Sequence, residues 1–102
     1  MAFWVLVLGM SVTPQYRELM SAIIRRFMVI VGSRTALQIA SKVPGVVVTA
    51  AGTVTSTADL STLSTLVAEY KKVGGTLSVH FMRREIAPLV EGSALPLPED
   101  LR

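Results

Sequence analysis

Apolar residues recur every three or four positions between Tyr16 and Val31, which is the spacing of a helix with one buried face. At 100° per residue most of them fall within an arc of about 140°, and polar side chains take the opposite side. Thr13-Pro14 precedes this stripe, and a threonine N-cap followed by proline is typical of a helix start. The pattern predicts a first helix whose broad apolar stripe needs a large surface to cover it.

Gly32-Ser33 interrupts the stripe and predicts either a break or a bend. A glycine C-cap followed by a serine N-cap favours a second helix from about Arg34 to Lys42, which Pro44-Gly45 would end. The alternative is one long bent helix through Gly32, because a single interior glycine costs only about 1 kcal/mol relative to alanine. Both alternatives keep this part of the chain helical.

The helical spacing disappears over residues 46–56, where valine and threonine dominate. Ala51-Gly52 offers a turn, so the segment is predicted to form a short β-hairpin. Two strands alone are marginally stable in water, so this hairpin is expected to pack on helices or to pair with another strand. An alternative α+β fold adds residues 3–8 and 76–81 as further strands.

Helical spacing returns after the hairpin and predicts two more helices. The first opens near Ser56–Asp59, where a serine and an acid three residues later resemble a capping box, and it ends at Gly74-Gly75. The second covers residues 77–90, although its start reads equally as a strand and Pro88 would kink it.

Residues 94–102 carry proline at alternate positions and are predicted to form an extended tail. This tail either folds back over the core through its leucines or projects as a peptide ligand. A chain of 102 residues suits a single domain, residues 1–102. The predicted fold class is therefore mainly α: a compact bundle of three to four helices with one small β-hairpin.

Apolar residues make up 51% of the chain and charged residues 17%, against an ordinary charged share of about a quarter. This composition excludes disorder, and it leaves more apolar surface than a small domain can hide. Aromatic residues and methionine are enriched at protein interfaces, although methionines of the first helix also suit the core. The predicted partner-binding residues lie in the apolar segment 1–10 and the first helix: Phe3, Trp4, Leu6, Leu8, Met20 and Met28.

The expected function is a non-enzymatic protein–protein interaction module, either a homo-oligomer or a small accessory or regulatory subunit of a larger assembly. The alternative is a small basic nucleic-acid-binding protein. Residues 1–48 carry five basic residues and one acid, a net charge of +4, whereas residues 49–102 carry five basic residues and six acids, a net charge of −1. Anion contacts would come from the first half, at Arg25, Arg26, Arg34 and Lys42, although a solvated helix face is the favoured interpretation of these residues.

No constellation for catalysis or metal binding is found in the sequence. His80 is the single histidine, cysteine is absent, and the acids are scattered, so neither a catalytic residue nor a metal ligand is predicted. Gly74-Gly75 follows two lysines, which is typical of a helix end and not of a phosphate loop. We expect no enzyme activity and no cofactor.

The apolar run from Ala2 to Gly9 is far shorter than the roughly 20 residues that span a bilayer. It lacks the basic residues that open a secretory signal, and no Ala-x-Ala-like site follows it. The expected location is the cytoplasm.

Overall fold

Helix α2, Tyr16–Val31, is the first element of the computed structural model, which describes residues 16–102. Its apolar stripe is buried as predicted, and the predicted cap at Thr13-Pro14 lies outside the described residues. Five large side chains of the stripe are at most 1% exposed: Leu19, Met20, Ile23, Ile24 and Phe27.

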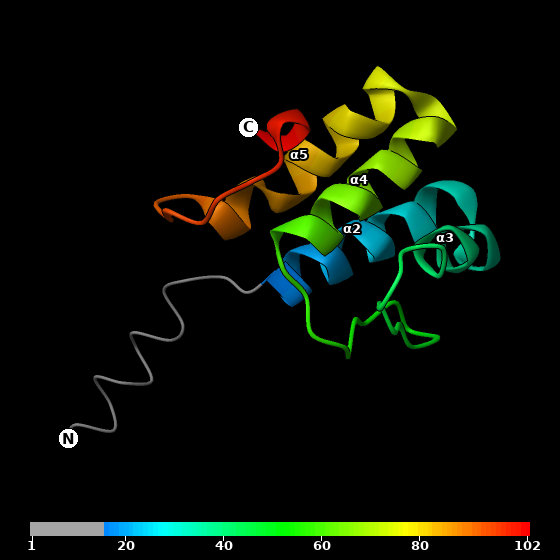
Figure 1. The fold of residues 1–102 in the computed structure, drawn as a ribbon. Coiled ribbons are helices and arrows are strands. Elements are labelled where there is room, and N and C mark those ends of the chain that lie inside the picture. The colour runs from blue at the N-terminus through cyan, green and yellow to red at the C-terminus, as the bar shows by residue number, and fades with distance from the viewer. Residues whose placement is uncertain (1–15) are drawn as a thin grey trace.

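Helix α3, Ser33–Ala40, follows after a single residue, so the alternative of one long bent helix is wrong. Gly32 separates the two helices with φ +93°, a backbone conformation that L side chains rarely adopt. The reversal at Gly32 lets α3 pack against α2 through Ala36, Ile39 and Ala40 (Figure 1).

Residues 46–56 form a hairpin-shaped loop without strands, so the predicted β-hairpin is wrong in this respect. A single antiparallel bridge joins Val48 to Val54. On either side of it, one backbone bond forms, Thr49 N to Thr53 O and Thr55 N to Val47 O, each 2.9 Å long. The two N–H groups that would complete these backbone pairs donate to side-chain hydroxyls instead.

Two side chains intercept the backbone N–H groups that a ladder would need. The N–H of Val47 donates to Ser56 Oγ at 3.0 Å, and that of Thr53 donates to Thr49 Oγ1 at 3.2 Å. Serine and threonine hydroxyls commonly compete with secondary structure in this way. The loop is instead fixed to helix α2, because the Val54 N–H donates to Ser21 Oγ at 2.9 Å.

Helices α4, Leu60–Gly74, and α5, Thr76–Val90, form the second half of the bundle. The capping box lies three residues later than predicted: the carboxylate of Asp59 accepts from the Thr62 N–H, and the Thr62 hydroxyl accepts from the Asp59 N–H. Residues 76–81 are helical, which overturns the α+β alternative for this segment. The proposed strand over residues 3–8 lies outside the described part of the chain.

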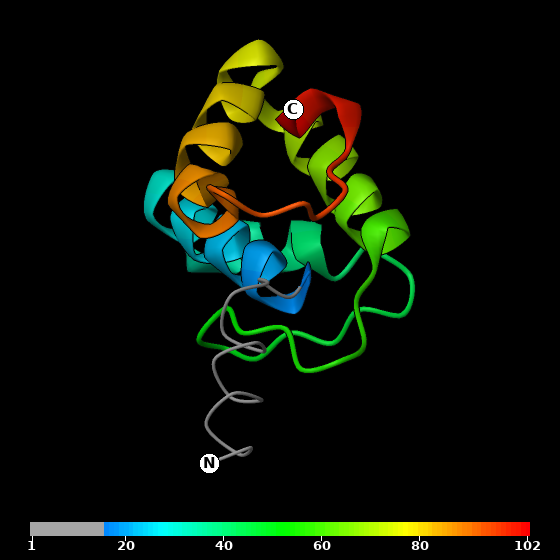
Figure 2. The same cartoon turned by 90° about the vertical axis from the view of Figure 1, so that its left-hand side faces the viewer.

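The last residues fold back over the helices and end in the 3-10 helix η1, Glu99–Leu101 (Figure 2). We call residues 91–102 the C-terminal arm. Leu101 is buried at 5% exposure, and the Tyr16 hydroxyl donates to the Pro96 carbonyl at 2.8 Å. An ion pair of 3.3 Å between Lys71 and Asp100 also joins the arm to α4.

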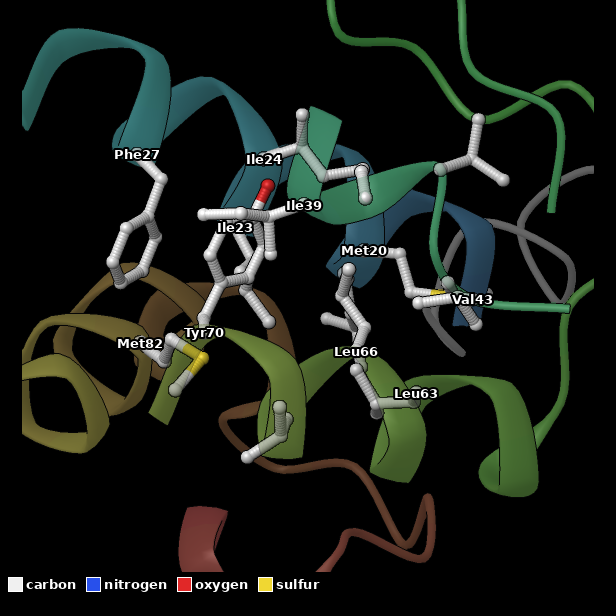
Figure 3. Packing of buried hydrophobic residues seen from close by; sticks show 14 of the residues in the cluster. Met20, Ile23, Ile24, Phe27, Ile39, Val43, Leu63, Leu66, Tyr70 and Met82 are labelled. Atoms are coloured by element: carbon white, nitrogen blue, oxygen red, sulfur yellow. The ribbon is translucent and has the colours of Figure 1, made fainter. Parts of the chain in front are cut away.

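The core lies between α2, α3 and α4 and extends to Met82 and Ile86 of α5 (Figure 3). Phe27 and Tyr70 stack with ring centroids 4.2 Å apart, and the Tyr70 hydroxyl donates to the Ala36 carbonyl at 2.8 Å. Burial raises the pKa of Tyr70, so this hydroxyl stays protonated and remains a donor. One side chain therefore connects α4 to both α2 and α3.

Candidate functional site

The structure divides the residues predicted to contact a partner. Phe3, Trp4, Leu6 and Leu8 lie outside the described residues. Met20 is fully buried in the core, so its side chain is not available to a partner. Met28 is partly buried beneath the 46–56 loop, where a Cβ built on Gly52 would approach its Sδ to 2.7 Å.

Exposed aliphatic side chains gather instead at the end of the bundle where α2 ends and α4 turns into α5. We call this group the end patch, and its members are Ile30, Val73 and Leu77, with exposures of 39%, 46% and 59%. Val29 is 77% exposed but, two residues after Phe27, lies on the opposite side of α2, away from α4. In Figure 1 the end of α2 and the α4–α5 turn lie toward the same end of the bundle.

Two contacts inside the bundle bring these residues to one end. The Phe27–Tyr70 stack joins α2 to α4, and one turn further along each helix lie Ile30 and Val73. The contact between Arg26 and the ring of Phe81 joins α2 to α5, and one turn nearer the start of α5 lies Leu77. Ile30 and Val73 thus lie one turn beyond the Phe27–Tyr70 stack, at the same end of the bundle as Leu77.

Basic residues surround the end patch. Arg26 and Lys72 lie next to it on α2 and α4, and Arg34 follows on the first turn of α3; all three are exposed. Glu69 is the one acid in the last two turns of α4, and it pairs with Lys72 at 3.1 Å. Lys72 is thus paired, and Arg26 and Arg34 supply the net positive charge beside the patch, with Glu85 lining a hollow next to Arg26.

The four predicted anion contacts do not converge. Arg25 donates to the hydroxyl of Thr53 and lines a hollow between α2 and the 46–56 loop, whereas Arg26 faces α5. Arg34 begins α3 and Lys42 follows its end. The sequence grouped these residues by chain position, but the fold points them at different neighbours.

A second group of basic residues, which the sequence analysis missed, does converge. A hollow of about 780 Å³ between α5 and the C-terminal arm is lined by four basic residues: His80, Arg83, Arg84 and Arg102. We call it the basic hollow. Three of them stand at i, i+3 and i+4 of α5, a spacing visible in the sequence that places side chains on one helix face. The part contributed by the arm had no such signal.

The described residues offer neither a cluster of metal ligands nor a helix able to cross a membrane. Residues 16–102 contain no group of three or more histidine, cysteine, aspartate or glutamate side chains arranged to hold a metal ion. His80 is exposed. Within the same residues, no helix has the length and hydropathy needed to cross a bilayer.

Comparisons with known proteins add no relative from which a function might be inferred. No protein-family model matches the chain. Neither a curated protein nor a solved structure matches it. The functional argument therefore depends on the end patch and the basic hollow.

Proposed function

We propose that this protein is a non-enzymatic interaction module, a small accessory or regulatory subunit that binds an acidic amphipathic segment of another protein at the end patch. The observation that carries the proposal is the exposure of Ile30, Val73 and Leu77 at the same end of the bundle. Contiguous exposed apolar surface typically marks interaction sites in small soluble domains. The proposed location remains the cytoplasm, as expected from the sequence.

Open space above both chain reversals supports docking at this end. A Cβ built on Gly32 or on Gly75 would meet no atom within 4 Å. Both glycines have positive φ, so each reversal is tight and leaves the neighbouring aliphatic side chains uncovered. A partner can therefore contact the end patch without first displacing another part of residues 16–102.

The net positive charge beside the end patch favours an acidic partner over a second copy of this chain. Arg26 and Arg34 supply this charge, so carboxylates flanking an apolar stripe would find complementary charge. A two-fold pairing of end patches would bring these cations against the same cations of the other copy, and like charges in close apposition oppose association. The charge argument selects the accessory-subunit form of the proposal.

Two synthetic amphipathic helices test this proposal: one with leucines at i, i+4 and i+7 flanked by glutamates, the other with lysines replacing the glutamates. Each is titrated into the full chain, and binding is followed by the backbone amide shifts in nuclear magnetic resonance spectra. We expect the acidic peptide to bind more tightly and to shift amides around Ile30 and Leu77.

Leu77→Ser should weaken this binding by about fivefold or more, because most of a leucine side chain loses its apolar contact. Val47→Ser is the matched control, because Val47 is also 59% exposed but lies in the 46–56 loop. Equal binding of both peptides, or equal loss in both variants, would contradict the proposal. Self-association that Leu77→Ser abolishes would instead identify a second copy as the occupant.

Residues 1–10 remain a predicted extension of the docking surface. Trp4 is the single tryptophan of the chain, so its fluorescence reports on this segment alone. If the segment joins the interface, the emission of Trp4 shifts to shorter wavelength when the acidic peptide is added. An unchanged spectrum at saturation would remove residues 1–10 from the interface and leave the end patch to act by itself.

A further inference from the structure

The basic hollow has features of a ligand site that the docking proposal does not use. His80, Arg83 and Arg84 come from one face of α5, and Arg102 comes from the C-terminal arm across the hollow. Glu91 is the one acid in its lining. With histidine neutral, the lining therefore carries three positive charges against one negative charge.

Within residues 16–102 the arginines on α5 form no ion pair, although Glu85 lines a small hollow with Arg84 and Arg26. The ion pairs within residues 16–102 are Lys71–Asp100 and Lys72–Glu69, and neither involves Arg83 or Arg84. Arg102 uses its Nε to donate to the Leu97 carbonyl at 3.1 Å, which fixes the direction of its guanidinium group. Three guanidinium groups with free donors can surround an anion with several oxygens.

The floor of the basic hollow is apolar. Ile86 and Leu101 are buried beneath it at 1% and 5% exposure, and Ala87, Pro88 and Val90 complete this side. A volume of about 780 Å³ lies within the ordinary range for small-molecule sites and is far larger than a single phosphate ion needs. The lining thus fits a ligand that combines an anionic group with an apolar body.

The wall opposite α5 is fixed before any ligand arrives. Leu101 inserts into the core, the ion pair of Lys71 with Asp100 joins the arm to α4, and Tyr16 donates to the Pro96 carbonyl. A fixed wall lowers the entropy that binding must spend on ordering the site. The arm therefore makes the basic hollow a preformed site.

We infer that the basic hollow binds a phosphate monoester joined to an apolar body, with Arg83 and Arg84 contacting the phosphate and the body lying on Ile86 and Leu101. Guanidinium groups match phosphate oxygens two at a time, and a phosphate monoester carries up to two negative charges. The inference does not depend on the docking proposal, because none of the three end-patch residues lines the hollow.

Three probes dissect the recognition: phenyl phosphate, inorganic phosphate and phenol, each titrated into the full chain and followed by amide shifts. Phenyl phosphate should bind about fivefold more tightly than inorganic phosphate, because its ring buries apolar surface on the floor. It should also bind far more tightly than phenol, which carries no charge for the arginines. The shifted amides should lie on α5 and in the C-terminal arm.

Arg84→Gln should weaken phenyl phosphate binding by about tenfold, the loss expected for one charge-assisted contact. Arg25→Gln is the matched control, because Arg25 also belongs to an adjacent arginine pair but faces the 46–56 loop. Leu77→Ser should leave phenyl phosphate binding unchanged, which separates a failure of this site from a failure of the end patch.

Flotation with vesicles containing phosphatidate distinguishes two sources of the same chemistry. Binding that Arg84→Gln abolishes identifies a lipid headgroup, whereas no flotation beside clear binding of phenyl phosphate identifies a soluble ligand. The inference fails if phenol binds as well as phenyl phosphate, or if Arg25→Gln and Arg84→Gln weaken binding equally. It also fails if single-stranded DNA binds with a steep salt dependence while phenyl phosphate does not bind.

Discussion

Helices α2 and α5 each carry two adjacent arginines, and the fold uses the two pairs differently. In α2 the pair is divided, because Arg25 contacts Thr53 of the 46–56 loop and Arg26 lies 6.0 Å from the centre of the Phe81 ring. Each of these arginines is occupied by a different neighbour. The two arginines therefore face different neighbours and do not converge on one ligand.

In α5 both members of the pair line the basic hollow, together with His80. Adjacent helix residues point about 100° apart, so two arginines face one ligand only where another element closes the space between them. The C-terminal arm does so beside α5, whereas α5 itself and the 46–56 loop take opposite sides of α2. Convergence thus depends on the elements surrounding a basic pair and not on the pair alone.

The largest expected loss of stability follows from removing the side chain of Phe27, which packs α2 against α4. Phe27 directly follows Arg25 and Arg26 in the sequence, so it also positions both arginines. Phe27→Ala should lower the free energy of unfolding by about 3–5 kcal/mol, because Phe27 is buried and stacks on Tyr70. Denaturant unfolding measures this loss. Phe81→Ala should lower the free energy of unfolding by clearly less, because Phe81, which contacts Arg26, is partly exposed. Equal losses in the two variants would contradict the burial assigned to Phe27 and Phe81.

A smaller loss of stability is expected at the hydrogen bond that fixes the 46–56 loop to α2. This is the loop that Arg25 contacts. Ser21→Ala should cost about 1–3 kcal/mol, because the buried N–H of Val54 loses its acceptor. Hydrogen exchange should accelerate at Val54 and along the loop, while the arm and α5 stay protected. Ser41→Ala is the control, since the exposed hydroxyl of Ser41 serves only the Gln38 carbonyl, and its effect should be negligible.

A pH titration sharpens the comparison, because arginines keep their charge at alkaline pH, whereas the hydroxyl of Tyr70 in the unfolded chain loses its proton above its ordinary pKa of 10.0. Burial raises the pKa of Tyr70 in the folded protein above its ordinary value of 10.0, so folding favours the neutral hydroxyl. The contribution of the neutral Tyr70 hydroxyl to the free energy of unfolding is complete below pH 10.0 and is lost as the pH rises towards the folded pKa.

Tyr70→Phe should therefore flatten the alkaline loss of stability, at a cost of about 1 kcal/mol near neutral pH for the missing hydrogen bond to Ala36. Unfolding curves between neutral pH and pH 11 measure both effects. Tyr16→Phe should keep the alkaline loss that Tyr70 causes. If the two variants lose stability alike at high pH, Tyr70 is not its source.

The smallest effect is expected at the ion pair that joins the arm to α4. Lys71 and Asp100 are 48% and 41% exposed, so a double-mutant cycle with Lys71→Met and Asp100→Asn should give a coupling of less than about 1 kcal/mol. Added salt should reduce the coupling further. A larger value would mean that this pair, and not Leu101, holds the arm against the bundle.

The sequence predicted the helices well because the apolar spacing and the glycines act locally. The end of α2 at Gly32 and the end of α4 at Gly74-Gly75 follow from backbone preferences that need no tertiary partner. The start of α4 was misplaced, because Ser56 and Asp59 are both good N-caps. Only the fold gives the Ser56 hydroxyl to the Val47 N–H and leaves Asp59 to cap the helix.

The 46–56 segment shows why residue preference alone did not predict its structure. Valine and threonine favour strands, but here hydroxyls of Thr49 and Ser56 take two of the N–H groups that a ladder would use. The predicted packing against helices is present, through Val54 and Ser21. The sequence contains these hydroxyls, yet their choice of partner depends on where α2 lies.

The candidate sites were the least predictable part. Summed charge favoured the first half of the chain, whereas the converging cations include three from the second half of net charge −1: Arg83, Arg84 and Arg102. The net charge of a segment does not tell where its side chains point. The C-terminal arm returns beside α5 and so brings together residues that are far apart along the chain. The end patch likewise unites two turns separated by some forty residues.

The order of the helices also sets the route by which the chain folds. Helices α2 and α3 are consecutive neighbours, as are α4 and α5, so each helical hairpin closes over a short loop. Short-range closure is fast, and helical domains of this size typically fold within about milliseconds. The long connection from α3 to α4 makes docking of the two hairpins through Phe27 and Tyr70 the slow step, and the transition state is expected to gather around that aromatic stack.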